Sequence, residues 1–137
     1  MAYQQTFEIR TRGRGTIEIS DEVAEIVRES GIFTGLVNIF VRHTSCSVVL
    51  TENVDPSVRR DLETLAVRWA PDGDPAYLHD DEGPDDMAAH GRNILAGSSL
   101  TIPLGNGQMQ LGTWQGIYLW EHRTSSSRRR LVVTVVG

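Results

Sequence analysis

The chain has 137 residues and a mass of 15.2 kDa, enough for one domain with a real hydrophobic core but too little for a second catalytic domain. Its net charge of -5 and its pI near 5.3 argue against a general nucleic-acid binder, whose surface is basic, and no apolar run approaches the roughly 20 residues of a membrane span. Because the N-terminus lacks the basic start and apolar stretch of a secretory signal, and the single cysteine Cys46 excludes an internal disulfide, we expect one cytoplasmic domain over residues 1–137, with no nucleic-acid or membrane partner.

Two strands and a helix are predicted at the start of the chain. Polar and apolar residues alternate over 3–11 and again over 16–19, which is typical of half-buried strands, and the glycines between these segments predict an opening hairpin. Ser20 then marks the start of a short helix with one apolar face, which Gly31 ends.

The middle of the chain predicts two strands followed by a longer helix. Compact apolar runs over 36–41 and 47–50 indicate the strands, so His43 lies where one ends and the next begins. Asp55 and the proline after it are typical of a helix N-terminus, and the helix continues to Pro71. One stripe of this helix is expected to face the core, formed by Val58, Leu62, Leu65 and Trp69.

The second half combines a loop, a third helix and four strands. Residues 71–84 carry the glycines and prolines of a loop, and Pro84 begins a helix that runs through Leu95. Asp86 and His90 share one face of that helix. The four strands are predicted over 99–104, 109–111, 115–120 and 131–136. Since strands outnumber helices and regular βαβ alternation is missing, we expect a β-rich α+β domain, a mostly antiparallel sheet or pseudo-barrel covered by two or three helices.

Carboxylates and imidazoles crowd together in the segment from His79 to His90. Such groups repel one another and compete for protons unless a cation or an anionic ligand compensates. Zinc and related divalent ions prefer the donors that this segment offers, from His79, Glu82, Asp86 and His90. His43 could join them from the strand region. The spacing matches no strict zinc motif, so solvated histidines beside an acidic helix start are the alternative interpretation.

Other polar residues have both a functional and a structural interpretation. Glu52 and Asn53 precede the Asp55 helix cap without a structural role of their own, and they are expected to face the site. Arg123 and the arginine triplet 128–130 offer guanidinium donors for phosphate, or else form a solvated hairpin tip.

Several other chemistries are disfavoured. The chain contains no lysine, which excludes a lysine Schiff base, and it has no glycine-rich phosphate loop. A serine nucleophile at Ser45 or Ser47 would lack the Gly-x-Ser-x-Gly elbow. Cys46 lies in an apolar strand and is expected in the core rather than as a ligand or nucleophile. Trp114 and Trp120 are expected in the core or a subunit interface rather than beside a planar ligand.

Four strings, in this order, resemble motifs of the YjbQ family of small bacterial and archaeal proteins, and the match covers nearly the whole chain. They are His43-Thr44-Ser45-Cys46, Glu52-Asn53-Val54-Asp55-Pro56, the segment from His79 to His90, and Leu111-Gly112-Thr113-Trp114-Gln115-Gly116-Ile117-Tyr118-Leu119. One departure is that the family's Met-Pro-Ala-His string reads Met87-Ala88-Ala89-His90 here, which removes no proposed ligand.

The resemblance implies a compact β-rich domain, assembled as a homotrimer, with weak secondary thiamine-phosphate synthase activity on small phosphorylated metabolites. In that reaction an aminopyrimidine diphosphate loses pyrophosphate, and the nitrogen of a thiazole phosphate attacks the freed methylene carbon. A divalent zinc, magnesium or manganese ion would neutralise the leaving pyrophosphate. The resemblance carries over six positions of a polar pocket: His43, Glu52, His79, Glu82, Asp86 and His90. Our own assignment of roles expects catalysis by His43, Glu52 and Asp86, substrate binding by Ser45, Asn53, Gln115 and Arg123, and metal binding by His79, Glu82 and His90.

Two alternative functions stay open. One is a metal-dependent phosphate-ester hydrolase with another substrate, and the other is a non-enzymatic trimer that binds a metal or a metabolite. The dedicated synthase resembles a TIM barrel, which needs about 200 residues or more, so a shared activity in this shorter chain would be convergent.

Overall fold

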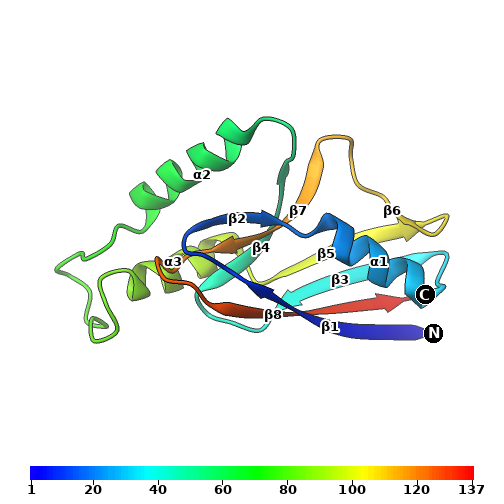
Figure 1. The fold of residues 1–137 in the computed structure, drawn as a ribbon, viewed down its shortest axis with the longest axis horizontal. Coiled ribbons are helices and arrows are strands. Elements are labelled where there is room, and N and C mark those ends of the chain that lie inside the picture. Colours follow the sequence, from blue (N-terminus) through cyan, green and yellow to red (C-terminus); the bar gives the residue numbers. More distant parts are fainter.

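The computed structural model describes all residues from Met1 to Gly137 (Figure 1). The helices are α1 (Ser20–Ser30), α2 (Pro56–Trp69) and α3 (Asp86–Ala96). The strands are β1 (Ala2–Arg10), β2 (Gly15–Glu18), β3 (Gly35–Val41), β4 (Cys46–Glu52), β5 (Ser99–Gly105), β6 (Gln108–Met109), β7 (Gln115–Glu121) and β8 (Arg128–Val136). Every predicted element has a counterpart, although α3 begins after Pro84 and β6 is very short. None of the helices combines the length and apolarity needed to cross a membrane, and the cytoplasmic location stays a prediction.

The strands form two antiparallel sheets. The larger sheet has the order β1, β8, β3, β5, β6, and the smaller one has the order β2, β7, β4. Together they curl into a half-barrel, with α1 packed along one side and α2 standing over the smaller sheet (Figure 1). The expected β-rich α+β domain with mostly antiparallel strands is therefore confirmed.

The predicted opening hairpin is wrong. β1 pairs with β8, whereas β2 pairs with β7 in the other sheet, so the loop between β1 and β2 crosses from one sheet to the other. Alternation in the sequence shows that a segment is a strand but not which strand it joins. Pairing with β8 lets Phe7 and Ile9 pack against the central core, which a local hairpin would not do.

The core lies between the two sheets and α1. Seventeen buried apolar side chains form one cluster, to which α1 contributes Val23, Ile26 and Val27. Full burial of one aliphatic side chain of this kind stabilises the fold by about 1.5–3 kcal/mol. α1 ends at Gly31, as predicted, because this glycine adopts the left-handed conformation with φ 66°.

α2 has the predicted N-terminus but not the predicted buried face. Asp55 caps the helix by accepting a hydrogen bond from the Ser57 N–H at 3.0 Å. Only Ala66 is buried, while Leu65 and Trp69 of the expected core stripe are 37% and 51% exposed.

Polar and charged side chains join α2 to the smaller sheet. Glu63 accepts a hydrogen bond from the Trp120 indole at 2.5 Å. The Arg59 guanidinium lies 5.1 Å from the centre of the Tyr118 ring, a cation–π arrangement. The helix therefore contacts the sheet largely through charged and aromatic side chains, and Leu65, Val67 and Trp69 are left exposed.

Candidate functional site

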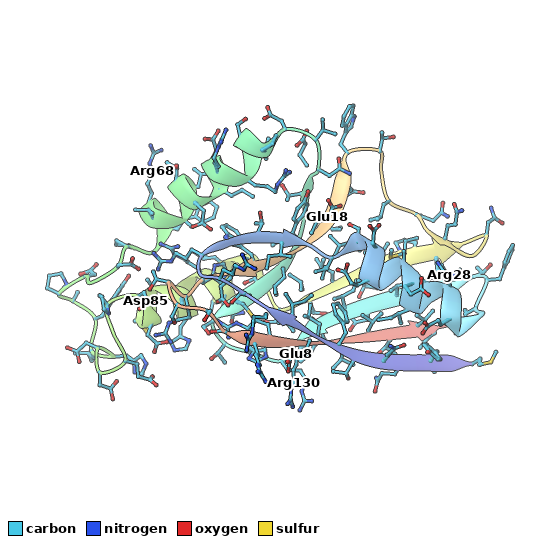
Figure 2. The ribbon with its side chains drawn as sticks, in the orientation of Figure 1. Glu8, Glu18, Arg28, Arg68, Asp85 and Arg130 are labelled. Carbon is cyan, nitrogen blue, oxygen red and sulfur yellow. The ribbon has the colours of Figure 1, made fainter.

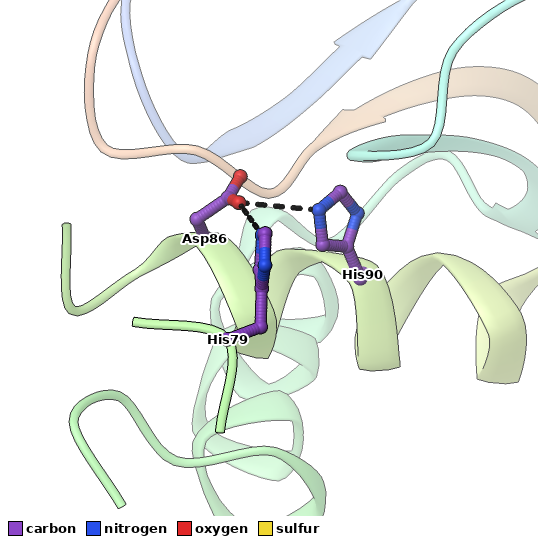
Figure 3. A group of neighbouring side chains, drawn as sticks. All are labelled: His79, Asp86 and His90. Atoms are coloured by element: carbon purple, nitrogen blue, oxygen red, sulfur yellow. Dashed lines mark hydrogen bonds and ion pairs between the residues drawn. The ribbon is translucent and has the colours of Figure 1, made fainter. Parts of the chain in front are cut away.

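The N-terminal turns of α3 and the loop before it bring three predicted metal ligands together. Asp86 and His90 lie one helical turn apart, so their side chains project to the same side of α3. The preceding loop is closed by a hydrogen bond from the Gly73 N–H to the Pro84 carbonyl at 2.9 Å, and it returns His79 to the same point (Figure 3).

The two imidazoles converge on a single carboxylate oxygen. Asp86 Oδ2 lies 2.7 Å from His79 Nε2 and 3.2 Å from His90 Nε2, as the dashed lines in Figure 3 show. These three ligand atoms all lie within 4.8 Å of one another. Glu82 Oε2 approaches His79 Nε2 at 3.2 Å. Asp86 itself is buried, whereas the side chains of His79 and His90 are 42% and 29% exposed.

The hydrogen-bond partners of His90 decide where its proton lies. Its Nδ1 is 2.8 Å from the Thr44 carbonyl oxygen, which only accepts, so Nδ1 carries a hydrogen. A neutral His90 then presents the lone pair of Nε2 to the Asp86 carboxylate, and these two electron-rich atoms repel. Only a proton on Nε2 or a cation between the two atoms removes the repulsion.

Arg123 holds the other oxygen of Asp86. Its Nη1 donates to Asp86 Oδ1 at 2.8 Å, its Nε donates to Asp85 Oδ2 at 3.0 Å, and its Nη2 donates to the Glu82 carbonyl at 3.0 Å. The guanidinium is therefore committed to positioning the carboxylates and the loop. Its assignment to substrate binding stays a prediction.

Hydrogen bonds and charges shift the pKa values in this cluster. Burial alone would raise the pKa of Asp86, but the hydrogen bond from His79 and the charges of His90 and Arg123 outweigh it and lower the pKa. Burial would also raise the pKa of Asp85. The hydrogen bonds that its carboxylate accepts from the Thr124 N–H and the Arg123 guanidinium outweigh burial and lower this pKa to about 2. The hydrogen bond to Asp86 raises the pKa of His79.

His43 and Ser45 lie near the cluster but face other partners. His43 Nε2 accepts a hydrogen bond from the Arg130 N–H at 2.8 Å, so its Nδ1 carries the hydrogen. Burial and the charge of Arg129 lower the pKa of His43. The imidazole borders a surface depression of about 400 Å³. Ser45 is buried and accepts a hydrogen bond from Arg129 Nη2 at 2.9 Å.

Glu52, Asn53 and Gln115 are not brought to the cluster within one chain. Glu52 lies opposite Gln115 at one end of the β4–β7 ladder, and Cys46 lies opposite Glu121 at the other, roughly 20 Å away along the strand. Glu52 accepts hydrogen bonds from the backbone before α2, and Gln115 accepts one from a nearby backbone N–H. Asn53 Oδ1 is buried without a partner. Their catalytic and binding roles stay predictions.

The sequence did not predict one buried ion pair. Arg129 is buried and paired with Glu121, which also accepts a hydrogen bond from the Thr11 hydroxyl at 2.6 Å. The interpretation of 128–130 as a solvated tip is therefore wrong for its middle residue. The alternation of β8 could have predicted this burial, because Arg129 lies two residues before the buried Leu131 and therefore on the same face of the strand.

The sequence also did not predict a buried contact between a serine and a histidine. Ser47 Oγ and His122 Nε2 are 2.9 Å apart and both residues are fully buried. Burial lowers the pKa of His122 to about 3, so the ring is neutral and structural.

Cys46 is fully buried in the core, as predicted, and burial raises the pKa of its thiol to about 12.

Comparison with known sequences shows one family over almost the whole chain. Residues 5–137 match the family model described as UPF0047 protein YjbQ-like. A UPF0047 protein from Synechocystis is 42% identical over 98% of this chain and 92% of its own length. The UPF0047 protein YjbQ from Escherichia coli O157:H7 is 41% identical over 100% of this chain and 99% of its own length.

Solved structures show the same fold. A YbjQ-like protein of unknown function from Sulfolobus solfataricus superposes with a TM-score of 0.88 at 25% identity, over 100% of this chain and 99% of that protein. A member of the yjbq/upf0047 family from Clostridium acetobutylicum superposes with a TM-score of 0.88 at 33% identity, over 96% of this chain and 99% of that protein. Sequence and fold agree, and the chain belongs to the UPF0047 YjbQ-like family.

Proposed function

We propose that this protein binds a divalent metal ion through His79, Asp86 and His90, with Glu82 as a further carboxylate donor. The convergence of two imidazole nitrogens on one buried carboxylate oxygen carries the proposal. The bond between His90 Nδ1 and the Thr44 carbonyl supports it, because metal-bound histidines usually donate their other ring N–H to such an acceptor.

The donor set favours zinc over magnesium. Two imidazoles with one or two carboxylates match zinc, and manganese less well. Magnesium prefers oxygen donors and keeps several waters. The side chains of His79 and His90 are partly exposed, so an ion held by them would be accessible to a substrate. An open position is characteristic of catalytic zinc sites rather than closed structural ones, and this favours an enzyme over a purely structural metal site.

The reaction that we propose is thiamine-phosphate synthesis, as a weak secondary activity on small phosphorylated metabolites. The C–O bond between the pyrimidine methylene and the diphosphate breaks, and pyrophosphate leaves with the electron pair. The thiazole ring nitrogen then forms the new C–N bond to the methylene carbon. The bound ion would supply the positive charge that stabilises the leaving pyrophosphate, and the positioning of the two substrates side by side supplies further acceleration.

The chain's own side chains have separate tasks in this proposal. Asp86 orients both imidazoles, and Arg123 fixes Asp86 through its other oxygen. His43 acts as a hydrogen-bond donor through Nδ1, because its Nε2 is occupied by the Arg130 N–H. A phosphate oxygen at the surface depression beside His43 is the acceptor that suits this donor.

We further propose that the chain assembles as a homotrimer. Leu36 and Phe40, on the side of β3 turned away from the core, are 47% and 45% exposed, and apolar side chains of this kind are commonly covered in assemblies. Glu52 and Gln115 lie far from the metal cluster of their own chain, and a neighbouring subunit would allow them to reach a site. Light scattering should give three times 15.2 kDa, and the mass of a single chain would contradict the proposal.

The first experiment compares Asp86→Asn with Asp80→Asn. Both changes remove one negative charge, but Asp80 is exposed and makes no ion pair. The protein is stripped of metal, and zinc binding and thiamine-phosphate formation are measured with and without added zinc. Wild type and Asp80→Asn should bind zinc and form product, whereas Asp86→Asn should do neither.

The same preparations separate the alternative functions. Zinc binding without synthesis, but with metal-dependent hydrolysis of one member of a phosphate-ester panel, would favour the hydrolase. Zinc binding without any turnover would favour the non-enzymatic trimer. Equal zinc binding by Asp86→Asn and wild type would contradict the metal site itself.

A further inference from the structure

Three arginines alternate around the turn from β1 to β2: Arg10 ends β1, and Arg12 and Arg14 lie in the loop that follows. The structure fixes this loop at one end. Arg14 makes two hydrogen bonds of 2.6 Å to the Asp72 carboxylate, and its Nε donates to the His122 carbonyl at 2.8 Å. This guanidinium is an anchor and is not free for a ligand.

Close packing at Gly13 holds the loop from the other side. Gly13 has a φ of 106°, and a Cβ at this position would lie 2.8 Å from the Thr124 carbonyl oxygen. A side chain is excluded both by backbone conformation and by space. The loop therefore keeps one shape against the segment that follows β7, and the groups it presents to solvent are preorganised.

The remaining two arginines have no anionic partner. Arg10 and Arg12 are exposed, and neither forms an ion pair, although the chain as a whole has a net charge of -5. Arg10 also lies directly opposite Arg128 in the β1–β8 ladder, and like charges in this position destabilise a sheet. The surface around Arg10 and Arg12 is therefore positively charged, although the chain as a whole has an excess of carboxylates.

These arginines line a recess that also offers backbone donors. The recess has a volume of about 240 Å³ and is lined by residues 10 and 12–17. The backbone N–H groups of Arg12, Gly13 and Arg14 donate to no backbone carbonyl. Successive free N–H groups at a glycine turn are a recurrent way of binding anions, and guanidinium forks add donors of matching geometry for phosphate oxygens.

We propose that this recess is a phosphate-binding site, formed by Arg10, Arg12 and the backbone of the β1–β2 loop, that takes a phosphate or diphosphate group of a small metabolite. It is separate from the metal cluster, because the segment 122–124 lies between them. The carbonyls of His122 and Thr124 contact the loop, while the Thr124 N–H contacts Asp85 on the other side. The recess needs no metal to bind phosphate, so this proposal does not depend on the proposed function.

Calorimetric titration of metal-stripped protein with inorganic pyrophosphate, in the presence of a chelator, tests the proposal directly. The variant Arg10→Gln/Arg12→Gln is compared with Arg60→Gln/Arg68→Gln, which removes the same charge from two exposed arginines of α2 without ion pairs. Wild type and the α2 variant should bind pyrophosphate equally, and the loop variant should lose roughly tenfold to a hundredfold in affinity. Equal losses in both variants, or none in either, would overturn the site.

A third variant distinguishes this site from the metal cluster. His90→Ala removes a proposed metal ligand and leaves the β1–β2 loop intact. With a chelator present the metal cluster holds no ion that could bind the diphosphate, so the pyrophosphate affinity of His90→Ala should equal that of wild type. Loss of binding in His90→Ala with retention in the loop variant would place the anion at the metal cluster and overturn the proposal. A single-stranded oligonucleotide at equal phosphate concentration should not compete with pyrophosphate, and competition would assign the recess to nucleic-acid phosphates instead.

Discussion

Two polar clusters lie close together in this fold and differ in how their charges are balanced. In the first, Glu121 is fully buried and receives hydrogen bonds from Thr11 and Arg129. Every strong acceptor there has a donor from the same chain. In the second, the buried Asp86 shares one oxygen between two partly exposed imidazoles, those of His79 and His90. The first cluster is complete without a ligand, whereas the second has facing acceptors that need a proton or a cation.

On the proposed function, the difference separates a structural ion pair from a binding site. Both clusters place a carboxylate beside a guanidinium, so residue types alone do not distinguish them. What distinguishes them is solvent access and the direction of lone pairs, since a ligand can enter only where donors converge and water reaches them. The following changes test the comparison, from the largest expected effect to the smallest.

Removing Arg129 should destabilise the protein most. Arg129→Ala leaves the Glu121 carboxylate buried without its cation, which costs about 3–5 kcal/mol in the free energy of unfolding. The neighbour Arg128 is exposed, so Arg128→Ala should change the free energy by no more than about 0.5 kcal/mol. Urea unfolding measures both. Similar losses in the two variants would mean that the buried pair is not the structural element we describe.

Removing Arg123 should weaken the open cluster without unfolding the chain. Arg123→Ala frees Asp86 Oδ1, and loss of such a supporting contact lowers metal affinity by about 10–100-fold. Zinc affinity is measured by competition with a chromophoric chelator. Arg68→Ala, at an exposed residue of α2 that forms no ion pair with the cluster (Figure 2), is the control and should keep wild-type affinity. An unchanged affinity in Arg123→Ala would show that Arg123 does not position the ligand.

Acid should remove the contribution of Asp85. Its folded pKa of about 2 lies below the ordinary 3.8, so its contribution to stability is present above that ordinary value and is lost as the pH falls toward 2. Asp85→Asn should therefore lower the melting temperature at pH 5, and the difference from wild type should shrink as the pH falls to 2. Thermal unfolding across this range, in the presence of a chelator, measures it. A constant difference would contradict the assigned pKa.

The exposed pair between Glu8 and Arg130 should matter least. Their charged atoms are 3.6 Å apart and the side chains are 43% and 63% exposed, and the two lie together on the open side of the sheet (Figure 2). A double-mutant cycle with Glu8→Ala and Arg130→Ala should give a coupling below about 0.5 kcal/mol. A coupling as large as that of the buried pair would mean that exposure does not separate the two cases.

Local patterns in the sequence were sufficient for the elements and for part of the site. Helical spacing put Asp86 and His90 on one face, and loop composition between Pro71 and Pro84 allowed His79 to return to them. These are short-range relations, fixed by the geometry of a helix and the closure of a loop. For the same reason the Asp55 cap and the Gly31 terminus were predicted correctly.

Long-range relations were not predictable in the same way. The partner of β1 is set by the packing of Phe7 and Ile9 on a distant strand, which alternation does not reveal. The face of α2 is set by Trp120 and Tyr118 of the sheet, so helical spacing alone assigned Leu65 to the core wrongly. Each error concerns which surfaces meet, a property of the whole chain rather than of a window.

The bond from His90 to the Thr44 carbonyl has a thermodynamic consequence. With Nδ1 held as a donor, the position between His90 Nε2 and Asp86 can be filled by a proton or by an ion, but not by both. At the proposed metal site, binding of the ion would therefore compete with a proton, and its apparent affinity should rise with pH. Calorimetry in buffers of different ionisation enthalpy would count the protons released for each ion bound.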